Sequence, residues 1–319
     1  MHANMRCLFL MGSLFLLQSL TLGTASAEEF PSPPIIQRQV NFWEKVFSDF
    51  NSNEFILHDR DNLDIIITSL KVPVSNNPKS NRPITSPDEE IEAYRKALRR
   101  FAVEGYGVRS KGKYEAEIWQ AYLKQHAIRD LLSGNAVLRV QGGLADTFYD
   151  ASHRAELYLP LMEKIFREHG LPPDLTRIVF VESMFNLKAR SKVGASGFWQ
   201  LMPGTAKSFI KVSKHRDERN SPLIATRAAA GVLRSNYKAL EAWPLAVTAY
   251  NHGQGGMKRA VAQLKTKDLA EIILLYDSPS FGFASRNFYS EFLAATKVHR
   301  QRMEQPVLSK VSEVKPDEG

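Results

Sequence analysis

The sequence predicts a mostly α-helical protein, and two observations support this. Apolar residues recur at helical spacing along most of the chain, and from residue 171 to residue 300 nearly every segment has this pattern. Strands do not alternate with helices there, so a parallel α/β sheet is not expected. Glycine and proline separate the segments at the points where helices would end or begin.

Composition and charge are those of a basic globular protein. The chain has 319 residues, of which 44% are hydrophobic and 24% charged, which excludes a largely disordered or collagen-like chain. Lysine and arginine number 42 against 34 aspartate and glutamate, so the net charge is +8. A basic chain favours anionic partners such as nucleic acid, a membrane surface or an acidic wall polymer, and charge alone does not choose among them.

Residues 1–27 have the three parts of a secretory signal peptide. Arg6 supplies the positive charge, residues 8–17 are apolar, and Ala-Ser-Ala at 25–27 offers a cleavage site. The apolar run is shorter than the roughly 20 residues that a membrane span needs, so we expect export rather than anchoring. The single cysteine, Cys7, lies in this segment, and no disulfide is therefore expected in the exported chain.

Residues 28–88 are expected to form an N-terminal extension that ends in a proline-rich linker. An amphipathic stretch at 42–50 predicts a helix. The β-branched run at 65–68 predicts a short strand or a buried edge. Prolines spread among Asn, Ser and Lys mark residues 71–88 as the linker.

Residues 89–150 are expected to form a mainly helical leader. Its first helix starts at Pro87, between a capping serine and two acidic residues, and ends at Gly105. A second helix is expected to stop at Gly134. A third is expected to run from residue 152 to residue 169, across the start of the next domain.

Residues 151–303 are expected to form one helical domain, followed by a loose tail at 304–319 that has few apolar residues. Within the domain the spacing predicts helices at 174–186, 203–212, 225–240, 244–250, 254–264, 268–275 and 285–303.

Glu182 is the candidate general acid. Ile178, Val181, Glu182 and Phe185 fall at positions i, i+3, i+4 and i+7, which places the glutamate on the apolar face of a hydrophobic helix. A lone glutamate in a helix is usually solvated, but apolar residues flank this one on both sides. A desolvated carboxyl group keeps its proton to higher pH and can act as a general acid.

Two glycine-containing segments follow. Small residues at 191–197 let the backbone approach a ligand closely, Phe198 and Trp199 can stack on sugars, and Gln200 can bind an amide. Taken alone, the segment is more typical of a tight turn between packed helices. The glycines at 253–256 lack the Gly-Lys-Ser/Thr of a phosphate loop, so they indicate a helix end followed by a new helix.

Together these segments resemble the lytic transglycosylases of glycoside hydrolase family 23. The resemblance rests on Glu182-Ser183, on Ser191, on Gly197-Phe198-Trp199-Gln200 and on Ala249-Tyr250-Asn251. It extends through residues 171–175, 202–206 and 216–229, and covers roughly residues 150–300.

This resemblance implies a lysozyme-like, mostly α-helical catalytic domain with a substrate groove. It also implies that Glu182 protonates the glycosidic oxygen between N-acetylmuramic acid and N-acetylglucosamine. The acetamide of the substrate would support the oxocarbenium-like centre, and Glu182 would then take the proton from the muramic 6-hydroxyl. The product would be a 1,6-anhydro end, formed without water and without the two-carboxylate scheme of most glycosidases.

The resemblance further implies substrate contacts. Ser191 would contact the acetamide and Gln200 the sugar amide, while Tyr250 would hydrogen-bond and orient Glu182, and Asn251 would line the groove. Gly197 and Phe198 are also expected to bind substrate. Only one of the side chains of Phe198 and Trp199 can point into the groove.

The sequence differs from the family pattern after Arg286-Asn287. In the family segment that these two residues resemble, a tyrosine follows directly. Here Phe288 takes that position and Tyr289 comes one residue, about 100° of helix, later. Tyr289 is kept as a candidate substrate residue.

The acidic residues provide a test of this reaction. An inverting hydrolase needs a second carboxylate roughly 6.5–9.5 Å from the acid. No Asp or Glu lies between Ser183 and Arg216, a stretch that holds several basic residues. A single acid fits non-hydrolytic cleavage better, unless Asp217, Glu218 or a leader residue folds inward. The basic residues suit anionic peptide stems or form a solvated face, and the sequence does not decide between them.

The expected partner is therefore peptidoglycan, and the expected location is the periplasm of a Gram-negative bacterium. A hydrolytic goose-type muramidase and a non-catalytic peptidoglycan-binding protein remain as alternatives. Nucleic-acid binding is not expected, because no recognisable motif supports it. No cofactor is expected, and the scattered histidines predict no metal site. A monomer is favoured, and peripheral association with membrane or wall stays open.

Overall fold

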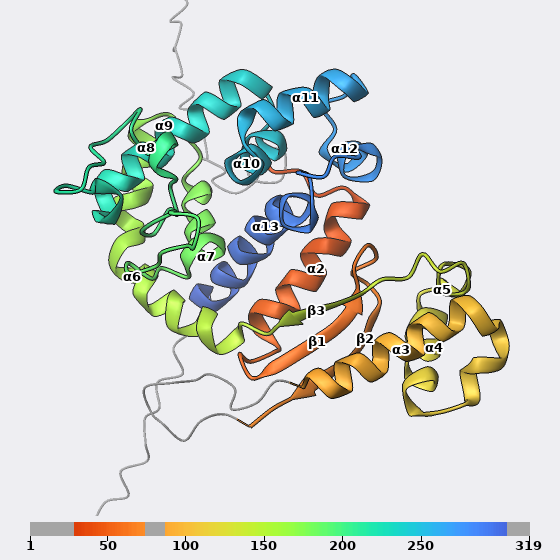
Figure 1. Cartoon of the computed structure of the whole chain (residues 1–319). Coiled ribbons are helices and arrows are strands. Elements are labelled where there is room, and N and C mark those ends of the chain that lie inside the picture. Colours follow the sequence, from red (N-terminus) through yellow and green to blue (C-terminus); the bar gives the residue numbers. More distant parts are fainter. Residues whose placement is uncertain (1–28, 74–86, 305–319) are drawn as a thin grey trace, which may run out of the picture.

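A computed structural model describes residues 29–73 and 87–304, and its helices confirm the mostly α-helical prediction (Figure 1). The expected signal peptide, most of the expected linker and nearly all of the expected tail lie outside the described residues. Within the described ranges, no helix combines the length and the apolar character that a membrane crossing requires.

Over its described residues, the N-terminal half combines helices with three strands. Its elements are α2 (Pro34–Ser48), β1 (Glu54–Asp59), β2 (Ile66–Lys71), α3 (Asp88–Glu104), η1 (Gly105–Ser110), α4 (Lys113–Lys124), α5 (Ile128–Leu132) and β3 (Leu138–Gly142). The C-terminal half is helical, with α6 (Ala145–Glu168), η2 (Pro173–Arg177), α7 (Ile178–Ser183), α8 (Pro203–Ala206), η3 (Glu218–Asn220), α9 (Pro222–Leu240), α10 (Trp243–His252), α11 (Gln254–Leu264), α12 (Leu269–Leu275) and α13 (Phe283–Glu304).

The three strands form an antiparallel sheet in the order β2-β1-β3, with Leu57 of β1 opposite Thr68 and Val140. Only β2 was predicted, from the β-branched run at 65–68. The N-terminal part is mainly helical, as expected, and β1 and β3 are additions that the sequence did not predict. Strand β3 follows the leader helices, far from β1 in sequence, so no hairpin turn signals their pairing.

The sheet separates two hydrophobic cores. Side chains alternate along β1, so Ile56 packs into the larger core with α2 while Leu57 packs into the smaller core of α3, α4 and α5. Asp59, on the smaller core's side, accepts a 2.6 Å hydrogen bond from the hydroxyl of Tyr122. One strand thus belongs to both cores at once.

Helix α2 lies along α13, so the first and last described helices are neighbours in space (Figure 1). The indole Nε1 of Trp43 donates to Oδ1 of Asn287 at 3.1 Å, and the ring of Phe47 stacks on Phe148 of α6 at 5.1 Å. Part of the expected N-terminal extension therefore shares its core with the C-terminal helices. The boundary expected between residues 150 and 151 falls inside α6.

Several expected helices differ in length from the observed ones. The stretch predicted at 174–186 divides into η2 and the six-residue α7, and the one at 203–212 is reduced to the four-residue α8. The second leader helix is broken into α4 and α5 at His126, whose φ is 55°. These breaks depend on local backbone conformations that apolar spacing does not report.

We expect Phe47→Ala to destabilise the whole C-terminal core, because the ring is 1% exposed and touches α6. The loss should be about 3–5 kcal/mol in the free energy of unfolding, measured by urea titration. The neighbouring exposed Lys45→Ala is the control and should change stability by less than about 0.5 kcal/mol. A separate early transition in the Phe47 variant would contradict a shared core.

Candidate active site

Glu182 lies in the last turn of α7, beside the buried residues Val179 and Phe180. Its carboxyl group is partly buried and makes no hydrogen bond or ion pair with any residue the structure describes. Burial raises the pKa of Glu182 to about 8, and the nearby charge of Glu291 adds to this effect. The group is therefore protonated at neutral pH, as a general acid must be before it acts.

The backbone around Glu182 is strained. Met184 and Phe185, directly after α7, have φ values of 49° and 52°, and Gln200 has a φ of 43°. Non-glycine residues rarely adopt this left-handed region, and such residues gather at functional sites. A guanidinium nitrogen of Arg154, from α6, donates to the carbonyl of Met184 at 2.9 Å and holds the helix end.

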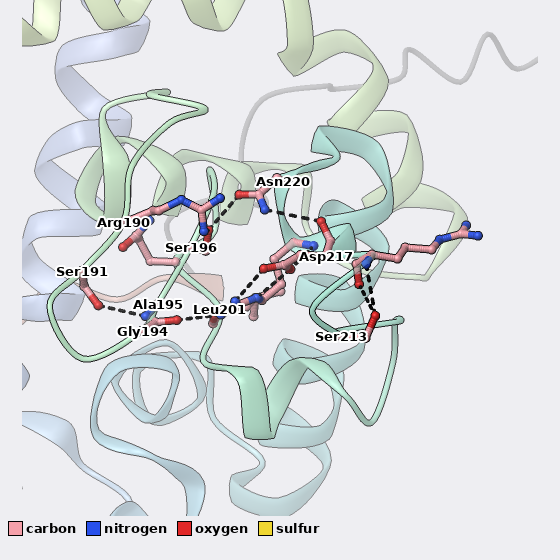
Figure 2. Close-up of polar contacts among 12 residues, drawn as sticks. Arg190, Ser191, Gly194, Ala195, Ser196, Leu201, Ser213, Asp217 and Asn220 are labelled. Atoms are coloured by element: carbon pink, nitrogen blue, oxygen red, sulfur yellow. Dashed lines mark hydrogen bonds and ion pairs between the residues drawn. The ribbon is translucent and has the colours of Figure 1, made fainter.

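A network of polar contacts fixes the loop at 190–201 against the segment at 217–220 (Figure 2). Arg190 donates to the Ser196 hydroxyl at 3.1 Å, and that hydroxyl donates to Oδ1 of Asn220 at 2.8 Å. Arg219, paired with Asp217, donates to the carbonyls of Gly194 at 2.7 Å and Leu201 at 2.9 Å. The loop that follows α7 is therefore held to this segment at its middle and at its C-terminal end.

Gly197 permits this packing. Its φ is +75°, and a Cβ built there would lie 2.1 Å from the carbonyl oxygen of Arg219. The small residues at 191–197 were expected to let the backbone approach a ligand closely. At Gly197 the close approach is instead to the backbone of Arg219. Ser183 ties the same loop to α7, because its hydroxyl donates to the carbonyl of Phe198 at 2.8 Å.

Ser191 and Gln200 lie on this loop with part of their polar groups free. The Ser191 hydroxyl oxygen accepts from the amide of Ala195 at 2.9 Å, and its own hydrogen remains able to donate. Gln200 uses its amide nitrogen to donate to the carbonyls of Ala189 at 3.1 Å and Gly197 at 2.7 Å. Both side chains are partly exposed, as contact with a ligand requires.

Phe198 was expected to contact substrate. This expectation is wrong, because its ring is 1% exposed and packs against Tyr158 and Phe185. Trp199 is also fully buried, with its Nε1 donating to the Thr226 hydroxyl at 3.0 Å. Neither aromatic side chain lines a groove. Both belong to the core beneath the loop, as the turn interpretation of this segment implies.

Tyr250 lies beside Glu182 but does not make the expected hydrogen bond to it. Its hydroxyl donates instead to the carbonyl of Trp199 at 2.8 Å. Burial, and after it the charge of Glu182, raise the pKa of Tyr250 well above its ordinary value. Asn251 is exposed, and its Oδ1 accepts from the Ser285 hydroxyl of α13 at 2.9 Å.

On α13, Phe288 rather than Tyr289 faces the site. The ring of Phe288 is parallel to that of Tyr250 within 10°, at a centroid distance of 6.4 Å. Tyr289 is 1% exposed, and its hydroxyl donates to the carbonyl of Pro31 at 3.0 Å. The expectation that Tyr289 contacts substrate is therefore wrong, since one residue of rotation turns it toward the N-terminal segment.

The second carboxylate near Glu182 is Glu291, which the sequence interpretation missed. Asp217 and Glu218 do not take this place: Asp217 is bonded to Arg219, Glu218 accepts from the Lys211 amide and pairs with Arg216, and neither acts on the charge of Glu182. Glu291 lies three residues after Phe288 on α13, so helix periodicity places it one turn further along the same face. A second carboxyl group lies near Glu182 only because α13 packs against α7.

A cleft of about 900 Å³ opens between the two halves of the chain. Helix α2, the β1–β2 turn, α12 and the start of α13 line it, with Arg60, Phe283 and Asn287 among its walls. No group of three or more His, Cys, Asp or Glu placed to hold a metal ion occurs in the described part of the chain. The basic residues between Lys188 and Arg216 lie on the surface, which favours the solvated face.

We expect Gly197→Ala to lower the free energy of unfolding by at least about 2 kcal/mol, because the added Cβ meets backbone and φ is positive. Thermal unfolding measures this. Gly204→Ala is the matched control, since nothing lies within 4 Å of its built Cβ. Equal loss in both variants would contradict a specific packing role for Gly197.

Comparison with known proteins finds similarity in the central part of the chain. Residues 162–273 match the family model of the transglycosylase SLT domain. A relative from Alteromonas sp. (strain M-1), named for tributyltin chloride resistance, is 36% identical over 118 residues, which are 36% of this chain and 57% of the relative. Membrane-bound lytic murein transglycosylase D of Escherichia coli (strain K12) is 30% identical over 121 residues, which are 37% of this chain and 27% of that protein.

Two solved structures are also similar. Lytic transglycosylase Slt of Pseudomonas aeruginosa, in an inactive mutant form, is 22% identical with a TM-score of 0.40, over 70% of this chain and 38% of that one. The 70 kDa soluble lytic transglycosylase of Escherichia coli is 18% identical with a TM-score of 0.38, over 74% of this chain and 38% of that one.

The matched segment thus spans between about a quarter and just over half of the curated relatives. It contains Glu182, the loop at 190–201 and Tyr250. Residues 162–273 of this chain are thus similar to the transglycosylase SLT domain.

Proposed function

We propose that this protein is a lytic transglycosylase of peptidoglycan. It cleaves the β-1,4 bond between N-acetylmuramic acid and N-acetylglucosamine and leaves 1,6-anhydro-muramic ends. The observation that carries the proposal is the carboxyl group of Glu182, protonated near neutral pH and without a partner among the described residues. It lies inside the segment that matches the SLT domain, next to a loop rigid enough to hold a sugar.

One glutamate serves as acid and then as base. Glu182 donates its proton to the glycosidic oxygen as the bond to the muramic C1 breaks, and the leaving sugar departs with a hydroxyl group. The acetamide of the substrate supports the positive charge that develops at C1. The ionised Glu182 then accepts the proton of the muramic 6-hydroxyl, whose oxygen bonds to C1. No water is consumed.

Substrate contacts come from the loop after α7 and from the end of α10. The Ser191 hydroxyl hydrogen and the Gln200 carbonyl oxygen complement the carbonyl and N–H groups of an acetamide. Asn251 is exposed near the end of α10, directly after Tyr250, whose hydroxyl bonds the carbonyl of Trp199 in the loop. We assign these three residues to glycan binding within a lysozyme-like groove.

A goose-type muramidase is the second candidate, and Glu291 is the observation that favours it. A hydrolase requires a second carboxylate to activate water, and Glu291 lies near Glu182. Two facts support the transglycosylase instead: burial raises the pKa of Glu291 to about 8, and a protonated carboxyl group is a poor base. A peptidoglycan-binding protein without turnover is the third candidate, and a desolvated acid next to strained backbone is costly for such a protein to keep.

We place the protein in the periplasm, with glycan strands as its partner. The basis is the signal-peptide pattern of the sequence together with the name of the murein enzyme among the relatives. A monomer remains our proposal for the oligomeric state.

Digestion of purified sacculi with the protein is expected to release muropeptides with 1,6-anhydro ends, detected by mass spectrometry. A hydrolase would release reducing muramic ends, which are heavier by one water. Reducing ends would replace the proposed reaction by muramidase activity, and absence of release would favour the binding protein.

Glu182→Gln is expected to lower the rate of release by at least about 100-fold, because general acid catalysis of this kind contributes 10²–10⁴-fold. Binding to sacculi, measured by co-sedimentation, is expected to remain. Glu168→Gln, at an exposed glutamate of α6, is the matched control and should keep full activity. Wild-type activity in the Glu182 variant would remove this residue from the mechanism.

Activity is expected to persist through neutral pH and to fall as the pH rises past about 8, because only the protonated form of Glu182 can donate. The sign follows from the raised pKa: the reactive form exists below that value and is lost above it. Rates measured between pH 5 and pH 10 test this. A decline that begins near pH 4.5, the ordinary value of a glutamate, would mean that Glu182 is solvated.

A further inference from the structure

The positive charge of the chain is concentrated in one segment. Residues 183–240 hold 11 lysines and arginines and two acidic residues, a net charge of +9 against +8 for the whole chain. The rest of the chain is therefore close to neutral. Figure 1 shows α8 and α9, which belong to this segment, on the part of the molecule away from the three strands.

Helix α9 provides the first part of a basic surface. Arg227, Arg234 and Lys238 fall at i, i+7 and i+11, so they lie along one stripe of the helix. All three are exposed, and none has an ion pair with a residue that the structure describes. The helix contains no acidic residue, and its one side-chain amide, that of Asn236, is buried and donates to the carbonyl of Ala246 at 3.2 Å.

Phe209 lies across the middle of this stripe. A Cβ built on Gly231, which shares the stripe with Arg227 and Arg234, would lie 2.5 Å from a ring carbon of Phe209. Glycine is unfavourable inside a helix, and here its missing side chain leaves the space in which the ring lies. The ring is not enclosed in return, because Phe209 is 45% exposed. The fold thus holds an aromatic side chain at the surface, next to two arginines.

Two lysines accompany Phe209. Lys207 and Lys211 stand two residues before and after it, and both are exposed without an ion pair among the described residues. The two acidic residues of the segment are already paired, Asp217 with Arg219 at 2.7 Å and Glu218 with Arg216 at 2.6 Å. Glu218 also accepts from the backbone amide of Lys211 at 2.7 Å. We call the following six residues the basic face: Lys207, Phe209, Lys211, Arg227, Arg234 and Lys238.

Tyr237 adds a second aromatic side chain, directly before Lys238. It is 40% exposed, and its ring stacks on Trp243 at a centroid distance of 4.3 Å. Lysines on a solvated surface are ordinary, but exposed aromatic rings flanked by unpaired cations are typical of the boundary between lipid and water. There the ring enters the headgroup region, and the cations meet the phosphates.

The chemistry of the basic face distinguishes between two kinds of anionic partner. A sugar stacked on an aromatic ring also needs acceptors for its hydroxyl groups. Residues 207–211 and the exposed positions of α9 supply Lys, Arg, Ser, Phe and Tyr, but no carboxylate and no side-chain amide. A phospholipid surface needs cations for its phosphates and apolar groups for the layer beneath them. These observations favour an anionic bilayer over a glycan.

We propose that the basic face binds the surface of an anionic phospholipid bilayer, with Phe209 inserted among the headgroups and the surrounding lysines and arginines on lipid phosphates. This is peripheral association with a membrane. It does not rest on the proposed function, because none of the six residues is assigned to catalysis or to glycan binding. Lipid binding and glycan cleavage can therefore be tested separately on the same protein.

The experiment is co-sedimentation of the protein with lipid vesicles. Vesicles of phosphatidylglycerol and phosphatidylcholine in equal amounts should bind the protein, whereas vesicles of phosphatidylcholine alone should not. Binding should weaken as salt is raised, because salt screens charges that are exposed to water. Equal binding to both kinds of vesicle, or binding to neither, would overturn the proposal.

Lys207→Gln combined with Lys211→Gln should raise the Kd for the anionic vesicles by about 25-fold, since each cation near such a surface contributes about fivefold. Lys71→Gln combined with Lys124→Gln is the matched control, because both of these lysines are exposed and the change in net charge is the same. This control pair lies in β2 and α4 and should leave the Kd unchanged. An equal loss in the two pairs would mean that net charge alone drives binding, and the basic face would be refuted.

Phe209→Ala should raise the Kd by about fivefold, because a half-exposed phenylalanine ring can no longer leave water. Tyr106→Ala, at an exposed aromatic residue of η1, is the control and should have no effect. Thermal unfolding establishes that each variant is folded. If Phe209→Ala fails to fold, the lysine pairs decide alone.

The same variants separate a membrane from the wall. The Lys207 and Lys211 double variant should release muropeptides from sacculi at the wild-type rate and bind sacculi as the wild type does. Loss of sacculus binding in this variant, together with no vesicle binding by the wild type, would make the basic face a site for wall polymer and overturn the proposal. Absence of muropeptide release by the wild type would refute the proposed function, while vesicle binding would still decide the role of the basic face.

Discussion

The packing of α2 along α13 is the contact on which the rest of the structure depends. It joins the first and last described helices, through the hydrogen bond of Trp43 to Asn287 and that of Tyr289 to the carbonyl of Pro31. Because α13 is held on this side by α2, its other side is presented to α7 and α10. The same contact brings the sheet close enough for Arg139 to reach the ring of Phe283. The environment of Glu182 is thus built from both ends of the chain.

The surroundings of Glu182 combine one buried carboxyl group with neighbours that are held by hydrogen bonds. Glu182 has no hydrogen-bond or ion-pair partner among the described residues, while its neighbours are bonded: Arg154 donates to the carbonyl of Met184, Ser183 donates to that of Phe198, and Arg219 donates to those of Gly194 and Leu201. Strain at the left-handed residues after α7 persists because these contacts determine the backbone. The backbone around Glu182 is therefore fixed by hydrogen bonds, while the carboxyl group of Glu182 itself has no such bond to the described residues.

Local patterns in the sequence were enough to predict the helices and the acid. Apolar spacing located α9 to α13 within a few residues, and the apolar neighbours of Glu182 indicated its burial. Contacts between residues far apart in the sequence could not be predicted from these local patterns. Strands β1 and β3 pair across the whole leader, and the orientation of Phe198 depends on Tyr158, far away in sequence. The proximity of Glu291 to Glu182 could not be predicted from the sequence, because it depends on which helix packs against α13.

The distance in sequence between α2 and α13 has a consequence for biosynthesis. Trp43 and Asn287 are 244 residues apart, so this contact cannot form until nearly the whole chain is available. Contacts of such long range form late and slow the folding of a chain. Glu291 arrives with α13, and the full environment of the acid arrives with it. A nascent or truncated chain therefore lacks the assembled surroundings of Glu182, which are complete only when the last described helix is present.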